Sequence, residues 1–191
     1  MNKNSLNLSD IQNVVNTFCK NNSLTINFKT EMPEGYETSN GTFDITSNTL
    51  YFNFSIMNDY PSFEILFYLY HELRHVLQYK KKSLFSDIII KSLNYVLMYN
   101  GVCYKLIGDN WYEAQICGNE EYLISAYLGQ PYEHDANNFA YENVKQVCGD
   151  SSELMKLYNY FLPKLQLSEE DYNNIYADID NQIKNSNKDN K

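Results

Sequence analysis

Two histidines and a glutamate in one short apolar segment are the residues of this chain best suited to chemistry. The stretch LFYLYHELRHVLQYK, residues 66–80, contains His71, Glu72 and His75 in the pattern HExxH. On an α-helix, residues four positions apart lie on one face a single turn apart, so both imidazoles can bind one metal ion. Glu72 lies about 100° round the helix, where its carboxylate can reach a metal-bound water without being a ligand. The spacing therefore predicts a zinc site in which Glu72 is the catalytic general base.

The competing interpretation is a buried helix that contains these residues for structural reasons. In residues 63–77 the ionisable side chains are Glu64, His71, Glu72, Arg74 and His75. A helix that is apolar on nearly every side is central and buried, so its polar residues need a reason. In this interpretation His71 and His75 are core residues with satisfied hydrogen bonds. Glu72 then pairs with Arg74 or with a lysine.

A third metal ligand must come from another part of the chain, because a catalytic zinc usually has three protein ligands and a water. The remaining histidine, His134, lies in the segment PYEHDANNFA between Glu133 and Asp135. On a helix, Glu133 shares a face with Asn137, which gives a carboxylate ligand with a supporting amide one turn on. Glu133 is the preferred ligand, and His134 and Asp135 are the alternatives. Asn137 and Asp135 are also candidates for residues that support the ligands by hydrogen bonds.

The segments YHELRHVLQY and PYEHDANNFAYE together resemble the minimal gluzincin metallopeptidases, in which a glutamate on a later helix completes HExxH. The second segment is similar to the E-x-[ED]-A-N-x-F-A motif of their short bacterial and phage members, including peptidases of mobile elements that cleave repressor proteins. The resemblance implies that His71, His75 and Glu133 bind Zn²⁺ and that Glu72 is the general base. It also implies that the strand TLYFNF, residues 49–54, lies along the cleft and can pair with an extended substrate.

The resemblance covers about residues 8–82 and 130–147. Residues 84–129 and the C-terminal helices have no counterpart in it. The segment between His75 and Glu133 is longer than a minimal member needs, so its helices are expected to form a lid, a specificity subsite or an extra interface.

Hydrophobic periodicity places the HExxH segment in an α+β fold. Residues 9–21 predict an amphipathic helix capped by Ser9, residues 23–28 predict a strand, and residues 42–56 predict a hairpin. The HExxH helix should run from about residue 62 to residue 81, with Asp59 or Ser62 as its cap. We therefore expect a zincin-like fold, with a small three-stranded sheet packed on the buried HExxH helix and on a second, ligand-bearing helix.

The rest of the chain predicts a mainly helical C-terminal part. We expect helices in the insertion at residues 84–129, the ligand-bearing helix from Pro131 to about Val147, and terminal helices in residues 150–184, the last capped by Ser168. These segments form one domain, residues 1–184, because no linker separates two folding units. Residues 185–191 are expected to be a disordered tail.

Composition excludes several classes of function. Hydrophobic residues make up 43% of the 191-residue chain, which is enough for a sizeable core. The formal net charge is -9 and the lysines are scattered apart from residues 80–82, so we expect no nucleic-acid partner. No apolar run has the length of a signal peptide core or a membrane span, so we expect a cytoplasmic protein with no membrane partner. The cysteines, which lack a CxxC pair, are expected to be free thiols in the core: Cys19, Cys103, Cys117 and Cys148.

The function predicted is that of a zinc-dependent metallopeptidase, which hydrolyses a peptide bond in a protein or peptide substrate through zinc-activated water and Glu72. One alternative is a zincin-like regulatory or binding module that holds metal without proteolysis. Another is a structural interaction protein without metal. Tyr127 and Tyr132 lie near the proposed third ligand and are candidates to stabilise an oxyanion. The richness in Asn, Lys, Ile, Tyr and Phe suits an AT-rich genome, such as that of a low-GC bacterium or its phage, and the oligomeric state is not indicated.

Overall fold

The chain folds into two compact units in the computed structural model, which describes residues 6–57, 59–108 and 110–189, the last three by their backbone alone. The first unit comprises the chain up to Lys82 together with Ala136–Tyr160. The second comprises Ser83–Asp135 together with the chain from Phe161 onward. The α+β class expected from the sequence is confirmed. The single domain expected over residues 1–184 stays a prediction.

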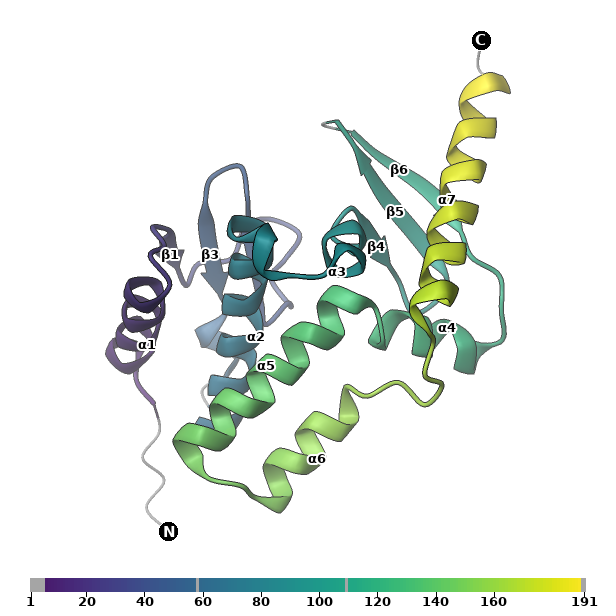
Figure 1. Cartoon of the computed structure of the whole chain (residues 1–191). Helices are drawn as coiled ribbons and strands as arrows, with labels where there is room; N and C mark the ends of the chain where they lie inside the picture. The colour runs from purple at the N-terminus through teal and green to yellow at the C-terminus, as the bar shows by residue number, and fades with distance from the viewer. Residues whose placement is uncertain (1–5, 58, 109, 190–191) are drawn as a thin grey trace. The chain divides into compact units, whose positions relative to one another are not determined.

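The first unit contains a three-stranded sheet and four helices that carry most of the candidate site. Its elements are α1 (Leu8–Asn21), β1 (Asn27–Lys29), β2 (Gly41–Asp44), β3 (Thr49–Phe52), the 3-10 helix η1 (Phe54–Met57), α2 (Ser62–Lys80), the larger part of α5 (Pro131–Cys148) and α6 (Ser152–Tyr160) (Figure 1). The strand order is β1-β3-β2, with β1 parallel and β2 antiparallel to β3. Helix α2 packs against β2 and β3.

This topology corrects one implication of the gluzincin resemblance. The segment TLYFNF contains β3, which is the central strand and has a hydrogen-bonded neighbour on each side. A strand that is paired on both sides offers no free edge to a peptide. The edge strand that lies beside Glu72 is β2, whose Gly41 lies against the Glu72 side chain.

Helix α2 is buried on most of its circumference, as its sequence predicts. Ten of its nineteen residues are buried, and these include Glu72, His75 and Gln78 among the apolar side chains. Neither Asp59 nor Ser62 caps it, because the N-cap is Pro61, which makes no side-chain cap hydrogen bond. In α1 the N-cap is Asn7 instead of Ser9. Its side chain accepts a hydrogen bond from the Asp10 N–H, and the Asp10 carboxylate accepts from the Asn7 N–H in a capping box.

The second unit corrects the prediction that residues 84–129 are a helical insertion, because this segment forms three strands as well as two helices. Its elements are α3 (Asp87–Ser92), β4 (Tyr95–Leu97), β5 (Val102–Ile107), β6 (Asn110–Gln115), α4 (Glu120–Leu128), the first turn of α5 and α7 (Glu169–Asp189) (Figure 1). The strands form an antiparallel sheet in the order β4-β5-β6. The hairpin turn between β4 and β5 contains Asn100 and Gly101, and Gly101 has a φ of 83° that favours glycine. An Asn-Gly pair between two β-rich runs is a hairpin signal, which explains why this segment forms strands instead of the expected helix.

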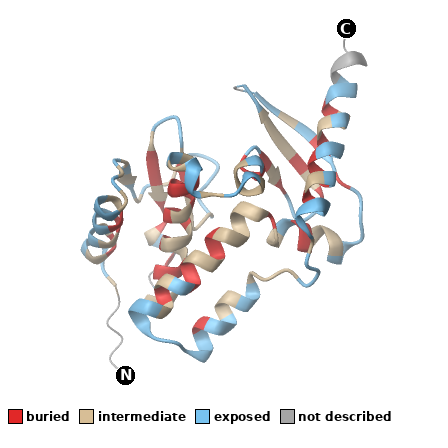
Figure 2. Cartoon of the chain, viewed as in Figure 1, coloured by how far each residue is buried: buried red, intermediate tan, exposed pale blue. Residues whose placement is uncertain are grey.

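Helix α7 covers one face of this second sheet. The buried side chains of α7 recur at helical spacing: Tyr172, Ile175, Tyr176, Ile179 and Ile183. They share a core with Tyr95 and Leu97 of β4 and Cys103 of β5. Figure 2 shows these buried positions on the side of α7 that is turned toward the strands. The helix begins where the sequence predicts, since the Asp171 N–H donates to Ser168 Oγ and the Ser168 N–H donates to the Asp171 carboxylate.

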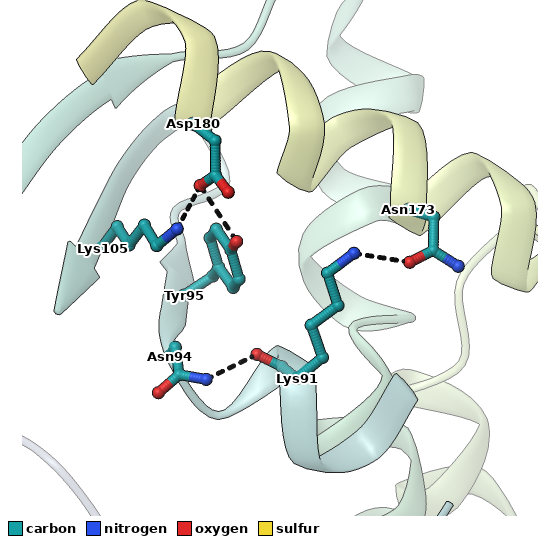
Figure 3. Close-up of polar contacts among 6 residues, drawn as sticks. All are labelled: Lys91, Asn94, Tyr95, Lys105, Asn173 and Asp180. Atoms are coloured by element: carbon teal, nitrogen blue, oxygen red, sulfur yellow. Dashed lines mark hydrogen bonds and ion pairs between the residues drawn. The ribbon is translucent and has the colours of Figure 1, made fainter. Parts of the chain in front are cut away.

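Polar contacts fix α7 against the strands at the edge of that core (Figure 3). The Tyr95 hydroxyl donates to Asp180 at 3.0 Å, and the Lys105 ammonium forms an ion pair with the same carboxylate oxygen. Lys91 donates to Asn173 Oδ1 at 2.7 Å. These contacts cross from α3, β4 and β5 to α7, so they set the position of the helix along the sheet.

The C-terminal residues and the cysteines differ in part from what the sequence predicts. Of the expected tail at 185–191, residues 185–189 continue α7, and residues 190 and 191 lie outside the described part. The cysteines are free thiols, but only Cys103 is buried in a core, and burial raises its pKa to about 11. Among the described residues, no helix combines the length and apolarity that a membrane crossing requires.

Candidate metal centre

Helix α2 brings the imidazoles of His71 and His75 together. The two Nε2 atoms lie 3.0 Å apart, and the rings are nearly perpendicular with centroids 4.6 Å apart. His75 is buried, with 8% of its surface exposed, and His71 is half-buried. The four-residue spacing of the sequence therefore places both nitrogens at one point, as helix geometry requires.

The other ring nitrogen of His71 is held by helix α5. His71 Nδ1 lies 2.8 Å from Asn137 Oδ1, and Asn137 is 3% exposed. An amide oxygen is an acceptor, so the His71 Nδ1 carries the proton and donates it. The lone pair of the neutral ring is then on Nε2, which is the nitrogen that faces His75.

The other ring nitrogen of His75 is held in the same way from its own helix. His75 Nδ1 lies 2.8 Å from the side-chain oxygen of Gln78, which is completely buried. The sequence interpretation did not include Gln78. Its signal was present, because a residue three positions after a helical histidine lies on the same face and can accept from its ring.

These two hydrogen bonds leave two acceptor nitrogens facing each other. Two lone pairs at 3.0 Å repel unless a positive charge lies between them, either a metal ion or a shared proton. Two nitrogens that bind one tetrahedral zinc ion at about 2.0–2.1 Å lie roughly 3.3 Å apart, which is close to the observed separation. Amide oxygens that orient the distal nitrogen of each histidine are typical of metal sites.

Glu133 adds a carboxylate to this pair. His71, His75 and Glu133 each offer one ligand atom, and these atoms lie within 4.8 Å of one another. This group can hold a metal ion, and no other group of three histidine, cysteine or carboxylate side chains with that ability is found in the described part of the chain. His134 and Asp135, the alternatives from the sequence, are outside the group. Burial lowers the pKa of His134, against a smaller opposing effect of the Asp135 charge.

The placement of Glu133 and Asn137 on one helix explains why α5 serves the site twice. Glu133 lies in the first turn of α5 and Asn137 lies one turn further on. Residues four apart share a face, so one side of the helix supplies a carboxylate to the group and an amide to His71. The sequence predicted this shared face.

Aromatic packing joins α1, α2 and α5 beside the histidines. Arg74, the only arginine of the chain, lies over the ring of Phe139 with 4.7 Å between its guanidinium carbon and the ring centroid. Tyr70 and Phe18 contact the same ring edge-on, at centroid distances of 6.4 Å and 6.0 Å. Phe139 therefore ties the helix that carries the histidines to the helix that carries Asn137.

Other residues singled out in the sequence have defined places. Glu72 lies in α2 with 8% of its surface exposed, between the two histidines in sequence and beside β2. Glu64 accepts a hydrogen bond from the Tyr68 hydroxyl at 3.3 Å within α2. Tyr127 is exposed in α4 and Tyr132 is half-buried in α5. The structure assigns no oxyanion role to either tyrosine.

No family model matches the sequence, and neither the curated proteins nor the solved structures include a significant match to this chain.

The two amide partners provide a test of the group as a metal site. Leucine has the same number and branching of side-chain heavy atoms as asparagine, and one heavy atom fewer than glutamine, but it accepts no hydrogen bond. We expect Asn137→Leu and Gln78→Leu each to weaken Zn²⁺ affinity by about 10- to 100-fold, because the freed ring can rotate or change tautomer. Affinity is measured by competition with a chromophoric chelator. Asn143→Leu is the control, since the Asn143 amide donates to the Phe139 carbonyl within α5. Affinities within twofold of wild type for both test variants would contradict the assignment of these roles.

Proposed function

We propose that this protein is a zinc-dependent metallopeptidase of the minimal gluzincin type, with a zincin-like first unit, acting in the cytoplasm on a protein substrate. The observation that carries the proposal is the pair of Nε2 atoms 3.0 Å apart with the Glu133 carboxylate in the same group. Two imidazoles and one carboxylate are the ligand set of many catalytic zinc sites, and they leave one position open. HExxH with a later glutamate is also the pattern on which the gluzincin resemblance rests.

The chemistry divides between a metal ion and Glu72. A zinc ion held by His71, His75 and Glu133 would polarise the scissile carbonyl and lower the pKa of a bound water. Glu72 follows His71 directly and is buried beside the group, so its carboxylate is the natural acceptor of the proton from that water. The same carboxyl group then returns the proton to the leaving amine. Asn137 and Gln78 hold the histidines in the tautomer that this arrangement requires.

The edge of β2 is where we expect an extended peptide to lie. The Asn53 N–H donates to the Asn40 carbonyl at 2.9 Å, and the register continues with Gly41 opposite Phe52. In an antiparallel pair, hydrogen-bonded and non-hydrogen-bonded positions alternate. The main-chain groups of Gly41 and Phe43 therefore point away from β3, toward the outer edge of β2. A peptide that pairs there would present its backbone beside Glu72.

The test begins with metal content. We expect about one zinc ion per chain by elemental mass spectrometry of the purified protein. The protein is then incubated with denatured proteome-derived polypeptides, and new amino termini are identified by labelling and mass spectrometry. We expect new termini that disappear after treatment with 1,10-phenanthroline and return when zinc is restored.

The other outcomes separate the alternative functions. Bound zinc without cleavage of any polypeptide would reject the peptidase and favour a metal-bound binding module. A protein that takes up no zinc, even when incubated with the metal, would leave the histidines as a core pair that shares a proton.

A further inference from the structure

The close approach of β2 to α2 at Gly41 is a feature that HExxH does not explain. A Cβ atom built on Gly41 would lie 2.6 Å from Glu72 Cγ and 2.9 Å from Glu72 Cδ. It would also lie 3.0 Å from the carbonyl oxygen of Tyr51. Gly41 has no positive φ, so the backbone conformation does not require glycine. The requirement comes from the Glu72 side chain, which fills the space that a Cβ would need.

The position of Gly41 is itself fixed by a buried amide. Asn53 is 2% exposed, and its side-chain nitrogen donates to the carbonyls of Glu37 and Ser39 at 2.8 Å and 3.0 Å. Its main-chain N–H donates to the carbonyl of Asn40. Three hydrogen bonds from one buried residue therefore hold the segment that leads into β2, and Gly41 is the next residue along.

A second contact fixes the other end of β2 on the same helix. The rings of Phe43 and Tyr79 lie with centroids 6.2 Å apart, and Phe43 is buried. Gly41 and Phe43 are two residues apart and so face the same side of the strand, while Glu72 and Tyr79 are two helical turns apart and so face the same side of α2. The strand therefore contacts α2 at both Gly41 and Phe43, and at Gly41 it has no side chain to offer.

We propose that Gly41 is a positioning residue for Glu72. The backbone of β2 at Gly41, which has no side chain, packs against the Glu72 side chain and fixes the position of its carboxylate. This inference rests on the proposed function, since it gives the general base its place. Glutamate has three rotatable side-chain bonds, so its carboxylate reaches the site reproducibly only if its methylene groups are confined. The helix confines one side of the Glu72 side chain and the Gly41 backbone confines the other.

The arrangement also links peptide pairing to the base. The outward main-chain groups of Gly41 are those offered to an extended peptide, while the inward side of the same residue touches Glu72. A peptide that pairs at Gly41 would therefore restrain the β2 backbone beside Glu72 during the reaction. A side chain at position 41 would point toward α2 and leave those outward groups intact.

The first experiment separates the chemical step from binding. We expect Gly41→Ala to lower kcat by about 100-fold, because a displacement of about 1 Å in a catalytic group has an effect of that size. We expect KM and zinc affinity to stay within about threefold of wild type, since neither the outward groups of β2 nor the ligands change. Gly118→Ala is the matched control, because the three nearest atoms to its Cβ would all belong to Tyr122 and the crowding would be equally severe. We expect that variant to keep wild-type kcat.

The second experiment does not depend on activity. In the double variant Gly41→Cys with Glu72→Cys, the sulfur at position 72 would lie near the place of Glu72 Cγ, within reach of a disulfide. We expect oxidised glutathione to form this disulfide, and peptide mapping distinguishes it from pairs involving the native cysteines. Gly35→Cys with Glu72→Cys is the control, since a Cβ at Gly35 would have no neighbour within 4 Å. We expect no disulfide in the control.

The outcomes distinguish this inference from the proposed function. A Gly41→Ala variant with wild-type kcat, in a wild-type protein that cleaves its substrate, would overturn the positioning role alone. A Gly41→Ala variant that loses zinc together with activity would also overturn it, because Gly41 would then be needed for the metal site or for folding and not for the position of Glu72. If Gly41→Ala does not fold, the disulfide decides: its formation supports the contact and its absence rejects it. A wild-type protein that cleaves nothing would reject the peptidase, whatever the disulfide shows.

Discussion

Replacing Glu72 by glutamine is expected to lower kcat by about 100- to 10,000-fold while the protein still binds one zinc ion, since general acid–base catalysis contributes about that factor. Glutamine has the shape of glutamate, so it fills the same space against Gly41. Its amide cannot accept the proton of a water or return one to the leaving amine. The measurement is kcat on a cleaved polypeptide together with zinc content by elemental mass spectrometry.

Glu64→Gln is the matched control for that variant. Glu64 is on the same helix, and its carboxylate accepts a hydrogen bond from Tyr68 instead of facing the metal group. We expect Glu64→Gln to keep kcat within about threefold of wild type. A Glu72→Gln protein with full activity would reject the mechanism. A Glu72→Gln protein without zinc would mean that Glu72 is needed for the metal site itself.

The Glu133→Ala variant is expected to lose zinc affinity by at least about a hundredfold, because two imidazoles alone are fewer than the three protein ligands of catalytic zinc sites. His71 and His75 keep their hydrogen bonds to Asn137 and Gln78 in this variant, so their orientation does not change. The loss of zinc affinity would therefore result from the missing carboxylate and not from a change in the histidines. Zinc affinity is measured by competition with a chelator, and thermal unfolding of the metal-free protein shows whether α5 still forms.

The neighbouring residues supply the controls for Glu133. His134→Ala and Asp135→Ala remove a potential ligand from the same helical turn, and both residues lie outside the group that the structure brings together. We expect both variants to bind zinc like wild type. Zinc lost on His134→Ala but kept on Glu133→Ala would establish a three-histidine site and reject the gluzincin assignment. Glu133→Asp is expected to retain part of the affinity, because the carboxylate is preserved on a shorter side chain.

The differences between sequence and structure have identifiable causes. Apolar periodicity predicts helices over residues 84–129, whereas Asn100 and Gly101 form the turn of the hairpin of β4 and β5. Serine is a common cap and favours Ser9 for α1, whereas Asn7 and Asp10 form the reciprocal pair. In both cases the decisive signal was local and present in the sequence.

Other features depend on contacts between distant segments. The gluzincin resemblance implies that the strand TLYFNF can pair with a peptide, and nothing in the sequence of β3 shows that β1 already pairs with one of its edges. The sequence around Gly41 is typical of a loop, and the contact of Gly41 with Glu72 is apparent only in the structure. Asn53 likewise reads as one asparagine among many, and its function is apparent only from the carbonyls that its amide reaches.

The sequence by itself determined the relations within each helix of this protein. His71 and His75 share a face, and Glu133 and Asn137 share another, because 3.6 residues per turn makes neighbours of residues four apart. Only the tertiary structure decided how those faces meet: which carboxylate joins the histidines, which amide takes the His71 proton, and which strand stands beside Glu72. The physical reason is that helix geometry is set by local covalent structure, whereas pairing between segments depends on packing that no local pattern records.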